Sequence, residues 1–454
     1  MPKRLLVLLA ALLLIRPAWA EFRSLLILHT NDLHDHLRPD YDGSGGLPYM
    51  AGYIAAQRAG RNDILLLDAG DVMEKGDLVA HKTQSRFSYE LMARMYYDVV
   101  TVGNHDFAYG PEHLKECLSL LQGTDVVCAN LVDEREKPMF RSSVVREING
   151  IRVGIIGLIT DTDDAKVLPW DKTIQTLKSE AARLKADADL LVALVHLGKR
   201  ECLALAKECP EIHLFVGGHS HEILKEPVKA ESGAWITQAG CYGEYIGRVE
   251  LEVEPDSGTV RFHSAMLVDM DHNTVSPDAE MISMIARKED EVCPEAKTML
   301  GRAEKGMGVA ELAHIAARGF VRMGDSDLGC CHTGLIFRDA LPAGVIDVNA
   351  VFRTGGQRGE TLVQSRMRGD QIRQYQEGLI RGKKGPTAIA DLRGEVKVDS
   401  LDPDRDYSVI LPEREWSSRL VKMLGDDVPS APAPVSFTFT DALAGELKTL
   451  LLPM

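Results

Sequence analysis

Residues 25–34 read Leu-Leu-Ile-Leu-His-Thr-Asn-Asp-Leu-His, an apolar run followed by polar residues. Leu25–His29 is an apolar run of the length expected for a buried β-strand, and the polar residues Asn31, Asp32 and His34 follow it directly. The same order recurs four times further along the chain, where a short apolar run ends and glycine, aspartate, asparagine or histidine follows. This recurrence predicts strands that each carry polar side chains at their carboxyl end.

The other four polar blocks also follow expected strands. They are Gly70-Asp71 after Ile64–Asp68, Gly103-Asn104-His105-Asp106 after Val99–Val102, His196 after Leu190–Val195, and Gly217-Gly218-His219-Ser220-His221 after Leu214–Val216. Strand ends of this kind meet in one crevice of an open α/β sheet. Each block alone has an ordinary explanation as a turn or a buried histidine. Together their oxygen and nitrogen donors predict a site for Mn, Fe, Zn or Co.

The strands alternate with helix-like stretches, which predicts an α/β class of fold with sheets between helical layers. Those stretches are Leu47–Arg58, Ser85–Met95, Pro111–Gln122 and Thr173–Lys185. We expect this domain to cover residues 21–265 and a polar helical connector to cover residues 266–305. A smaller domain is expected over residues 306–454, with a helix at Val309–Arg322 and strands at Ala388–Ala390 and Val409–Leu411.

The N-terminus has the features of a secretory signal peptide. Lys3 and Arg4 precede an apolar run from Leu5 to Ile15, and Ala18-Trp19-Ala20 has the small-x-small pattern of a cleavage site. The sequence therefore predicts a signal peptide over residues 1–20 and a secreted, periplasmic protein without a stable membrane anchor. The alternative is an anchor that is left uncleaved.

The charge balance restricts the partners of the protein. The 52 Lys and Arg residues against 67 Asp and Glu residues give a net charge of −15, which disfavours binding to nucleic acid or to a membrane surface by charge. An anionic substrate would then need local positive charge, such as metal ions. The eight cysteines form no zinc-type C-x-x-C pair, and a Cys117–Cys128 disulfide and isolated buried thiols remain equally open.

The polar blocks, taken in order, read D-x-H, G-D, G-N-H-D, a lone His and G-H-x-H. This series resembles the signature of the calcineurin-like metallophosphoesterase superfamily. Within it, T-N-D-L-H, L-L-L-D-A-G-D, V-G-N-H-D-F, L-V-H-L-G and G-G-H-S-H resemble the secreted 5′-nucleotidase family, strongly over residues 25–255 and weakly over 300–410. The resemblance implies a four-layer α-β-β-α sandwich followed by a smaller α+β domain that contacts the substrate.

The resemblance also implies a site with two divalent metal ions, of Mn, Zn, Fe or Co. One ion is expected on Asp32, His34 and His221, and the other on Asn104, His196 and His219, while Asp71 bridges both. Two such ions clamp the attacking and leaving oxygens of an in-line displacement. His105 is the expected catalytic residue, which stabilises the phosphoryl oxygens or protonates the leaving group.

Two departures from the family pattern matter. The family usually reads G-N-H-E-F-D, whose final Asp orients the catalytic His, but Ala108 stands at that place. Either His105 is then a less basic acid, or another carboxylate takes that role. The C-terminal region also lacks the G-G-D segment that accompanies base stacking. The substrate-binding candidates there are Arg338, Phe352 and Arg353, and Arg358 is a weaker one.

We therefore expect an exported hydrolase of phosphate esters that resembles a 5′-nucleotidase of nucleotide catabolism. Its partner would be a small phosphate ester or a nucleotide, and its oligomeric state is open. Two alternatives remain. One is a thiosulfohydrolase of the same family that cleaves a sulfur ester, and the other is a metal-binding module without catalysis.

Overall fold

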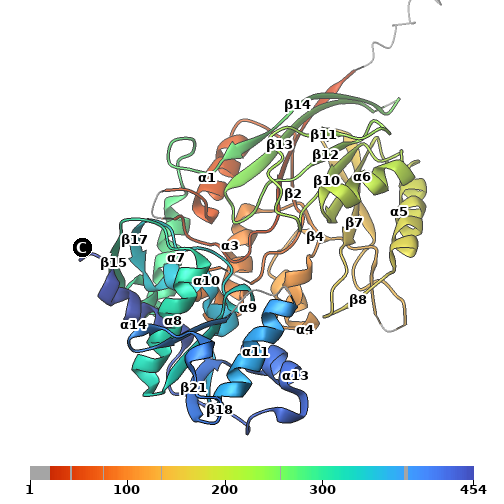
Figure 1. Cartoon of the computed structure of the whole chain (residues 1–454). Coiled ribbons are helices and arrows are strands. Elements are labelled where there is room, and N and C mark those ends of the chain that lie inside the picture. Colours follow the sequence, from red (N-terminus) through yellow and green to blue (C-terminus); the bar gives the residue numbers. More distant parts are fainter. Residues whose placement is uncertain are drawn as a thin grey trace, which may run out of the picture.

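The computed structural model of this protein describes residues 21–40, 43–74, 76–133, 135–255, 257–382 and 387–453. The predicted signal peptide, residues 1–20, lies outside the described residues. Figure 1 shows two parts, an N-terminal one that runs from red to green and a C-terminal one in blue.

The first sheet of the N-terminal part contains the strand predicted at Leu25–His29. Its order is β14-β13-β1-β2-β3-β4. The strands are β1 (Arg23–Thr30), β2 (Ile64–Asp68), β3 (Val99–Val100), β4 (Asp125–Val126), β13 (Tyr245–Glu254) and β14 (Thr259–Asp269). Strands β1 to β4 are parallel, so the loops that follow them leave the sheet at the same edge.

The second sheet repeats this arrangement. Its order is β11-β12-β10-β9-β7-β6. The strands are β6 (Ser143–Ile148), β7 (Ile151–Ile159), β9 (Leu190–His196), β10 (Leu214–Val216), β11 (Val228–Lys229) and β12 (Trp235–Thr237). Strands β7, β9, β10 and β12 are parallel, so His196 and the residues after Val216 also lie at one common edge.

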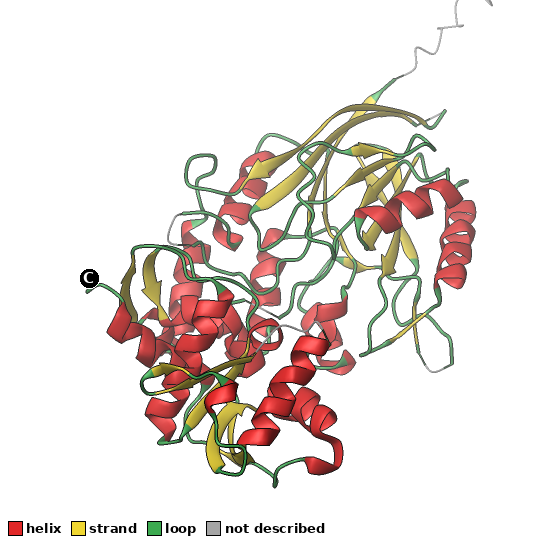
Figure 2. Cartoon of the chain, viewed as in Figure 1, coloured by secondary structure: helices red, strands yellow, loops and turns green. Residues whose placement is uncertain are grey.

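The two sheets pack face to face between two layers of helices (Figure 2). Alternate residues of β1 face opposite ways: Leu25 and Ile27 pack into the core between the sheets, and Leu26 and Leu28 pack under helices. The first sheet is covered by α1 (Leu47–Arg58), α3 (Arg86–Met95), α4 (Pro111–Leu118) and α7 (Ala279–Val292), and the second by α5 (Trp170–Leu184) and α6 (Lys199–Glu208). The predicted four-layer sandwich is confirmed.

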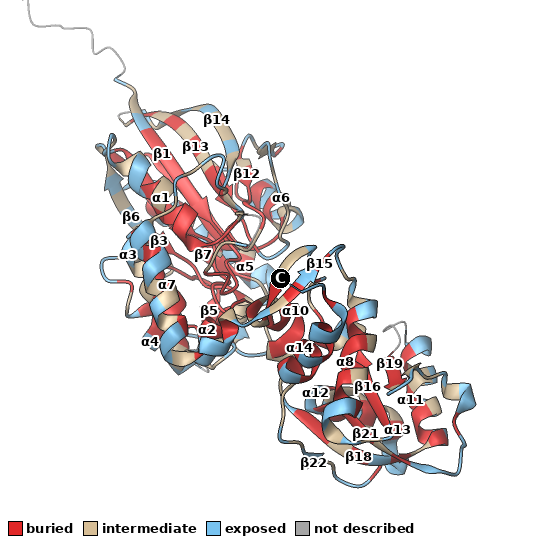
Figure 3. Ribbon diagram, turned by 90° about the vertical axis from the view of Figure 1, so that its left-hand side faces the viewer, coloured by how far each residue is buried: buried red, intermediate tan, exposed pale blue. Residues whose placement is uncertain are grey.

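The C-terminal part has its own six-stranded sheet, in the order β20-β19-β16-β21-β18-β22. The strands are β16 (Leu328–His332), β18 (Leu362–Arg368), β19 (Thr387–Asp391), β20 (Gly394–Glu395), β21 (Asp406–Pro412) and β22 (Ala433–Pro434). Helices α8 (Val309–Gly324), α10 (Val348–Gly359) and α14 (Phe439–Leu450) share the core on one face, and α11 (Gly369–Arg381) and α13 (Val421–Leu424) share the core on the other. Figure 3 shows this part as a lobe below the sandwich.

The range expected to be a helical connector is only partly helical. Helix α7 lies in it, but residues 266–269 are the end of β14, and β15 (Met299–Ala303) pairs with β17 (Gly344–Asp347). Strand β14 is at the edge of its sheet, and its side chains are mostly exposed or half-buried. A strand with so few buried side chains has no apolar run to identify it, and therefore the sequence pattern missed it.

All eight cysteines lie in the described part of the chain, and all are free thiols. Seven of them are buried, and Cys241 is half-buried. Among the helices of the described residues, none has both the length and the apolar character that crossing a bilayer would need.

Candidate active site

The five polar blocks meet above the carboxyl ends of β1, β2, β3, β9 and β10. The first group of side chains is Asp32, His34 and His221. Asp32 Oδ1 lies 3.7 Å from His34 Nε2 and 3.3 Å from His221 Nε2, and the two imidazole nitrogens are 3.0 Å apart. Asp32 and His34 are distant in sequence from His221, so the sheet topology and not the local chain brings these donors together.

The second group is Asp71, His196 and His219, and it lies beside the first. Asp71 Oδ2 is 3.0 Å from His196 Nε2 and 3.8 Å from His34 Nε2, so one carboxylate faces both groups. Asn104 Oδ1 is 3.0 Å from His219 Nδ1. The structure thus brings together all seven residues expected to bind metal, with Asp71 at the centre.

The outer ring nitrogens of two histidines fix their tautomers. His34 Nδ1 donates to the carbonyl of Met73 at 3.2 Å, and His196 Nδ1 donates to the carbonyl of Ala69 at 2.8 Å. Both Nε2 atoms then face the Asp71 carboxylate, as in a metal ligand whose orientation is set by a backbone acceptor. The buried Nε2 of His196 has no hydrogen bond of good geometry within the described residues. This donor set fits divalent cations.

The backbone at the site is held in unusual conformations. Five of the seven expected ligands have positive φ: Asp32 (52°), His34 (48°), Asp71 (60°), His219 (69°) and His221 (55°). For a residue other than glycine this conformation costs roughly 1–3 kcal/mol, and such residues cluster at functional sites. The two neighbouring loops also pack tightly, since a Cβ on Gly103 would lie 2.1 Å from Asp71 Oδ1.

Asp106 holds these two loops together. Its buried carboxylate accepts hydrogen bonds from the backbone N–H groups of Asp71, Val72 and Gly103, at 3.0, 2.9 and 2.7 Å. Burial and the nearby Asp71 charge raise the pKa of Asp106. The sequence showed Asp106 only as part of the G-N-H-D block, because the hydrogen bonds that define its role come from another loop.

The charge state of Asp71 follows from its neighbours. Burial by itself would raise the pKa of this carboxyl, but the imidazoles of His196 and His34 outweigh burial and hold it far below its usual range. Burial would likewise lower the pKa of His196, and the Asp71 charge raises it instead, to about 10. Asp71 and His196 therefore form an ion pair at the centre of the site as long as no cation is bound.

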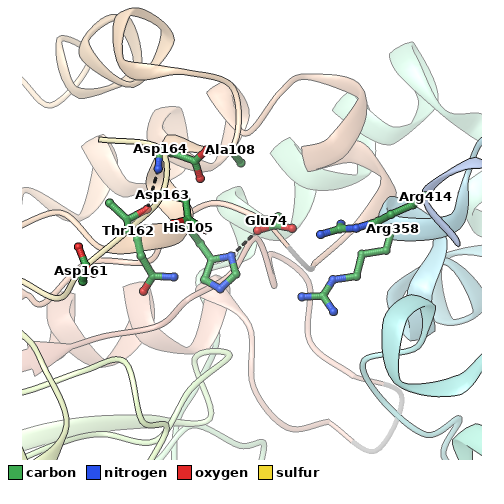
Figure 4. Close-up of a pocket in the computed structure, with 10 residues that line it drawn as sticks. Glu74, His105, Ala108, Asp161, Thr162, Asp163, Asp164, Arg358 and Arg414 are labelled. Atoms are coloured by element: carbon green, nitrogen blue, oxygen red, sulfur yellow. Dashed lines mark hydrogen bonds and ion pairs between the residues drawn. The ribbon is translucent and has the colours of Figure 1, made fainter. Parts of the chain in front are cut away.

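His105 lies at the edge of the metal-ligand groups. Its backbone N–H donates to Asp71 Oδ1 at 2.7 Å, and its ring packs edge-on to His34 with the centroids 5.1 Å apart. Its Nδ1 forms a close ion pair with Glu74, from the loop after β2 (Figure 4). No motif in the sequence marks Glu74 as a partner of His105. The only signal was indirect, since Ala108 left His105 without its usual carboxylate.

A cavity of about 370 Å³ opens beside His105. Figure 4 shows Arg358 and Arg414 on one side of His105 and the loop of residues 161–164 on the other. Burial and the charge of Arg338 lower the pKa of Arg358 to about 10. Among the described residues that line this cavity there is no Phe, Tyr or Trp.

The three candidate substrate contacts have different environments. Arg338 pairs closely with Glu74 and is thus next to the site, and its Nε and Nη1 lack hydrogen-bond partners among the described residues. Arg353 instead pairs with Asp77, at 2.7 Å, and with Asp40. Phe352 is 2% exposed and packs against His81. Neither Arg353 nor Phe352 lines the cavity, because α10 turns both toward the N-terminal part.

Comparison with known proteins agrees with this geometry. Residues 25–222 match the family described as calcineurin-like phosphoesterase. The chain is 29% identical to the mouse 5′-nucleotidase over 307 residues, which are 57% of this chain and 51% of the mouse protein. It spans 34% and 20% of the lengths of two longer relatives from Bacillus subtilis. It thus covers at most about half of these relatives.

Solved structures share the fold over nearly the whole chain. A 5′-nucleotidase precursor from Thermus thermophilus superposes with a TM-score of 0.73 and 22% identity, covering 95% of this chain and 97% of that one. The sulfate thiohydrolase SoxB from Thermus thermophilus superposes with a TM-score of 0.70 and 14% identity, covering 94% of both chains. By the match over residues 25–222 the chain resembles the calcineurin-like phosphoesterases, and among them the 5′-nucleotidases.

Proposed function

We propose that this protein is a metal-dependent hydrolase of small phosphate esters, with two divalent cations in its active site. The observation that carries the proposal is the pair of ligand groups that share Asp71 and lie directly beside His105. One ion would be held by Asp32, His34 and His221, and the other by Asn104, His196 and His219. Mn, Zn, Fe and Co all suit these donors.

Two cations there would polarise the phosphate oxygens and make a water molecule acidic enough to attack at neutral pH. The residues of the chain supply the rest. Glu74 holds the Nδ1 side of His105, which leaves Nε2 for the substrate. From there His105 donates a hydrogen bond to the phosphoryl group or a proton to the leaving oxygen. Arg338 supplies positive charge next to the same place.

The residues that line the cavity indicate which substrate would fit. Arg358 and Arg414 line it, and no aromatic side chain apart from His105 is present among its described lining residues. Asp161, Asp163 and Asp164 line the opposite side, so the side with the two arginines is the one that favours a second anionic group on the leaving group over recognition by base stacking. A nucleoside diphosphate or a nucleotide sugar therefore suits it better than a nucleoside monophosphate does.

The same observation favours a second candidate, hydrolysis of a sulfur ester by the same metal site. A cavity without a base-stacking pair does not need a nucleotide, and SoxB is a sulfate thiohydrolase that shares this fold. The seven candidate ligands brought together at the strand ends argue against a metal-binding module without catalysis.

The test is a substrate screen on metal-replete protein, with metal analysis of the same sample. AMP, UDP-glucose, bis(p-nitrophenyl) phosphate and a thiosulfonate are compared in the presence of Mn²⁺. We expect about two metal ions per chain and hydrolysis of a phosphate ester that a chelator abolishes. Turnover of the thiosulfonate alone would favour the sulfur ester, and no turnover with two ions bound would overturn both hydrolase candidates.

We also propose the organisation and the export that the sequence predicts. The domains follow the ranges predicted from the sequence, residues 21–265 and 306–454 joined by residues 266–305, except that β14 extends the first domain to Asp269, and the signal peptide is removed after Ala20. N-terminal sequencing of the protein recovered outside the cytoplasm tests the cleavage, and the sequence should begin at Glu21. An intact N-terminus in that protein would contradict the predicted cleavage.

A further inference from the structure

The partner of His105 comes from an unexpected loop. His105 lies in the 3₁₀-helix Asn104–Phe107, and Ala108 follows this helix, one turn after His105. The methyl group of Ala108 cannot accept a hydrogen bond. Glu74 reaches the same imidazole from the loop after β2, and its Oε2 contacts His105 Nδ1. Both side chains are mostly buried, with 22% of His105 and 17% of Glu74 exposed.

The position of Glu74 is fixed from several sides. Its φ is 70°, and its backbone N–H donates to Asp35 Oδ2 at 2.7 Å. Asp35 is itself buried and accepts hydrogen bonds from Ser85 and Ser88. The second carboxylate oxygen of Glu74 pairs with Arg338. A side chain fixed in this way stays in one geometry and can orient its neighbour.

The neighbours of Glu74 favour its charged form. Burial would raise the pKa of this carboxyl, but the hydrogen bond from His105 and the charge of Arg338 lower it to about 2. The other carboxylates that line the cavity, Asp161, Asp163 and Asp164, show no hydrogen bond to His105. Within the described residues, Glu74 is thus the carboxylate that pairs with the His105 ring.

We propose that Glu74 is the positioning residue of His105, and that it performs from the loop after β2 the role that Ala108 cannot perform. It accepts the Nδ1–H of the imidazole, fixes the ring and its tautomer, and leaves Nε2 directed at the substrate. The inference rests on the proposed hydrolase function. It adds that this chain has moved the carboxylate of the pair from one loop to another.

The test combines Glu74→Gln with a second substitution that returns a carboxylate to the other loop. Ala108 is exposed, has helical φ and ψ (−53°, −29°) and lines the same cavity, so Ala108→Asp fits without strain. We expect Glu74→Gln to lower kcat by about 10- to 100-fold, as loss of an orienting partner does. The double variant Glu74→Gln, Ala108→Asp should recover most of kcat, which a merely structural role of Glu74 would not allow.

Two controls separate the contributions. Glu112→Gln, on the exposed surface of α4, should leave kcat unchanged. Arg338→Gln removes the other partner of Glu74 and should raise KM more than it lowers kcat. Wild-type kcat in Glu74→Gln, or no recovery in the double variant, would overturn the inference.

A measurement without turnover keeps the inference independent of the proposed function. In full-length protein labelled with ¹⁵N-histidine, the His105 signal should show a protonated Nδ1 in the wild type and a mixture of tautomers in Glu74→Gln. If the wild-type protein hydrolyses nothing, the proposed function fails while this spectrum still tests the contact. A His105 spectrum that is identical in both proteins would show that Glu74 does not fix the tautomer.

Discussion

The two parts of the molecule contribute to the site in different ways. The N-terminal sandwich provides its residues at the ends of buried parallel strands, so the topology that forms the core also places the candidate ligands. The C-terminal part provides arginines such as Arg338, Arg358 and Arg414, whose positions depend on how the part docks. Under the proposed function, the sandwich would set the reaction chemistry and the second part would set the choice of substrate.

The largest effect on hydrolysis is expected for Asp71→Asn, in the sandwich. The carboxylate faces both ligand groups, so its loss should lower metal content and abolish nearly all hydrolysis, as measured by elemental analysis and turnover. Asp68→Asn is the matched control. Burial raises the pKa of Asp68 to about 8, and this carboxyl belongs to neither ligand group, so Asp68→Asn should change metal content and turnover much less than Asp71→Asn. A fully active Asp71→Asn protein would contradict the assignment.

Replacing His105 should have the next largest effect. For His105→Asn we expect a loss of about 10²- to 10⁴-fold in kcat with metal content unchanged, since the ring serves in proton transfer or in stabilising the phosphoryl group. If the ring protonates the leaving group, the loss is larger for an alkyl ester than for a p-nitrophenyl ester, because p-nitrophenolate leaves without a proton. Steady-state rates with both esters measure this, and an unchanged kcat with both would exclude a catalytic role.

Arg358→Gln tests whether the C-terminal part selects the leaving group. Charged hydrogen bonds of about 1.5–3 kcal/mol correspond to a loss of roughly 10- to 100-fold in kcat/KM for a substrate with a second anionic group. A substrate without that group, such as p-nitrophenyl phosphate, should be affected little. The ratio of kcat/KM for the two substrates is the readout, and equal losses for both would mean that Arg358 does not select the leaving group.

The smallest effect on turnover is expected for Asp77→Asn, at the contact between the parts. Asp77 is fully buried and pairs with Arg353, and burial, which would raise its pKa, is outweighed by the Arg353 charge, which holds it well below the usual range. Removing one partner of a buried pair costs about 3–5 kcal/mol of stability. Denaturant unfolding at pH 7 should show a loss of this order.

The pH dependence of that loss has a definite sign. Because the folded-state pKa of Asp77 is depressed, its contribution is fully present above the unfolded pKa of about 3.9 and shrinks as pH falls below that value. The stability difference between wild type and Asp77→Asn should therefore be constant near neutrality and decrease below about pH 4. A difference that grows on acidification would rule out this origin.

The sequence was sufficient for the sandwich because the strands there are buried and apolar, as in β2 and β9. The candidate ligands follow such strands directly, and for that reason the sequence alone predicts Asp32, His34, His196 and His221 as candidates. Edge strand β14 was missed because few of its side chains are buried.

A local sequence pattern could not predict residues whose role depends on a partner far along the chain. Glu74 and His105 are 31 residues apart, and Arg338 and Glu74 are 264 residues apart. No local pattern records such contacts. Arg353 and Phe352 were expected near the substrate, but the docking of α10 turned both toward the interior of the molecule.

The buried Asp77 contact also determines how this protein can be recombined with its relatives. Its carboxylate accepts from the backbone of Leu37 and Arg38 in one part and from Asn349 and Arg353 in the other, at 2.8, 3.0, 2.5 and 2.7 Å. A chimaera that took its C-terminal half from a relative without an asparagine and an arginine at these places would leave the buried Asp77 carboxylate without its ion-pair partner Arg353 and with only its donors from the N-terminal part. Grafting a new specificity onto this catalytic scaffold thus requires the two matching residues of α10 to be transferred with it.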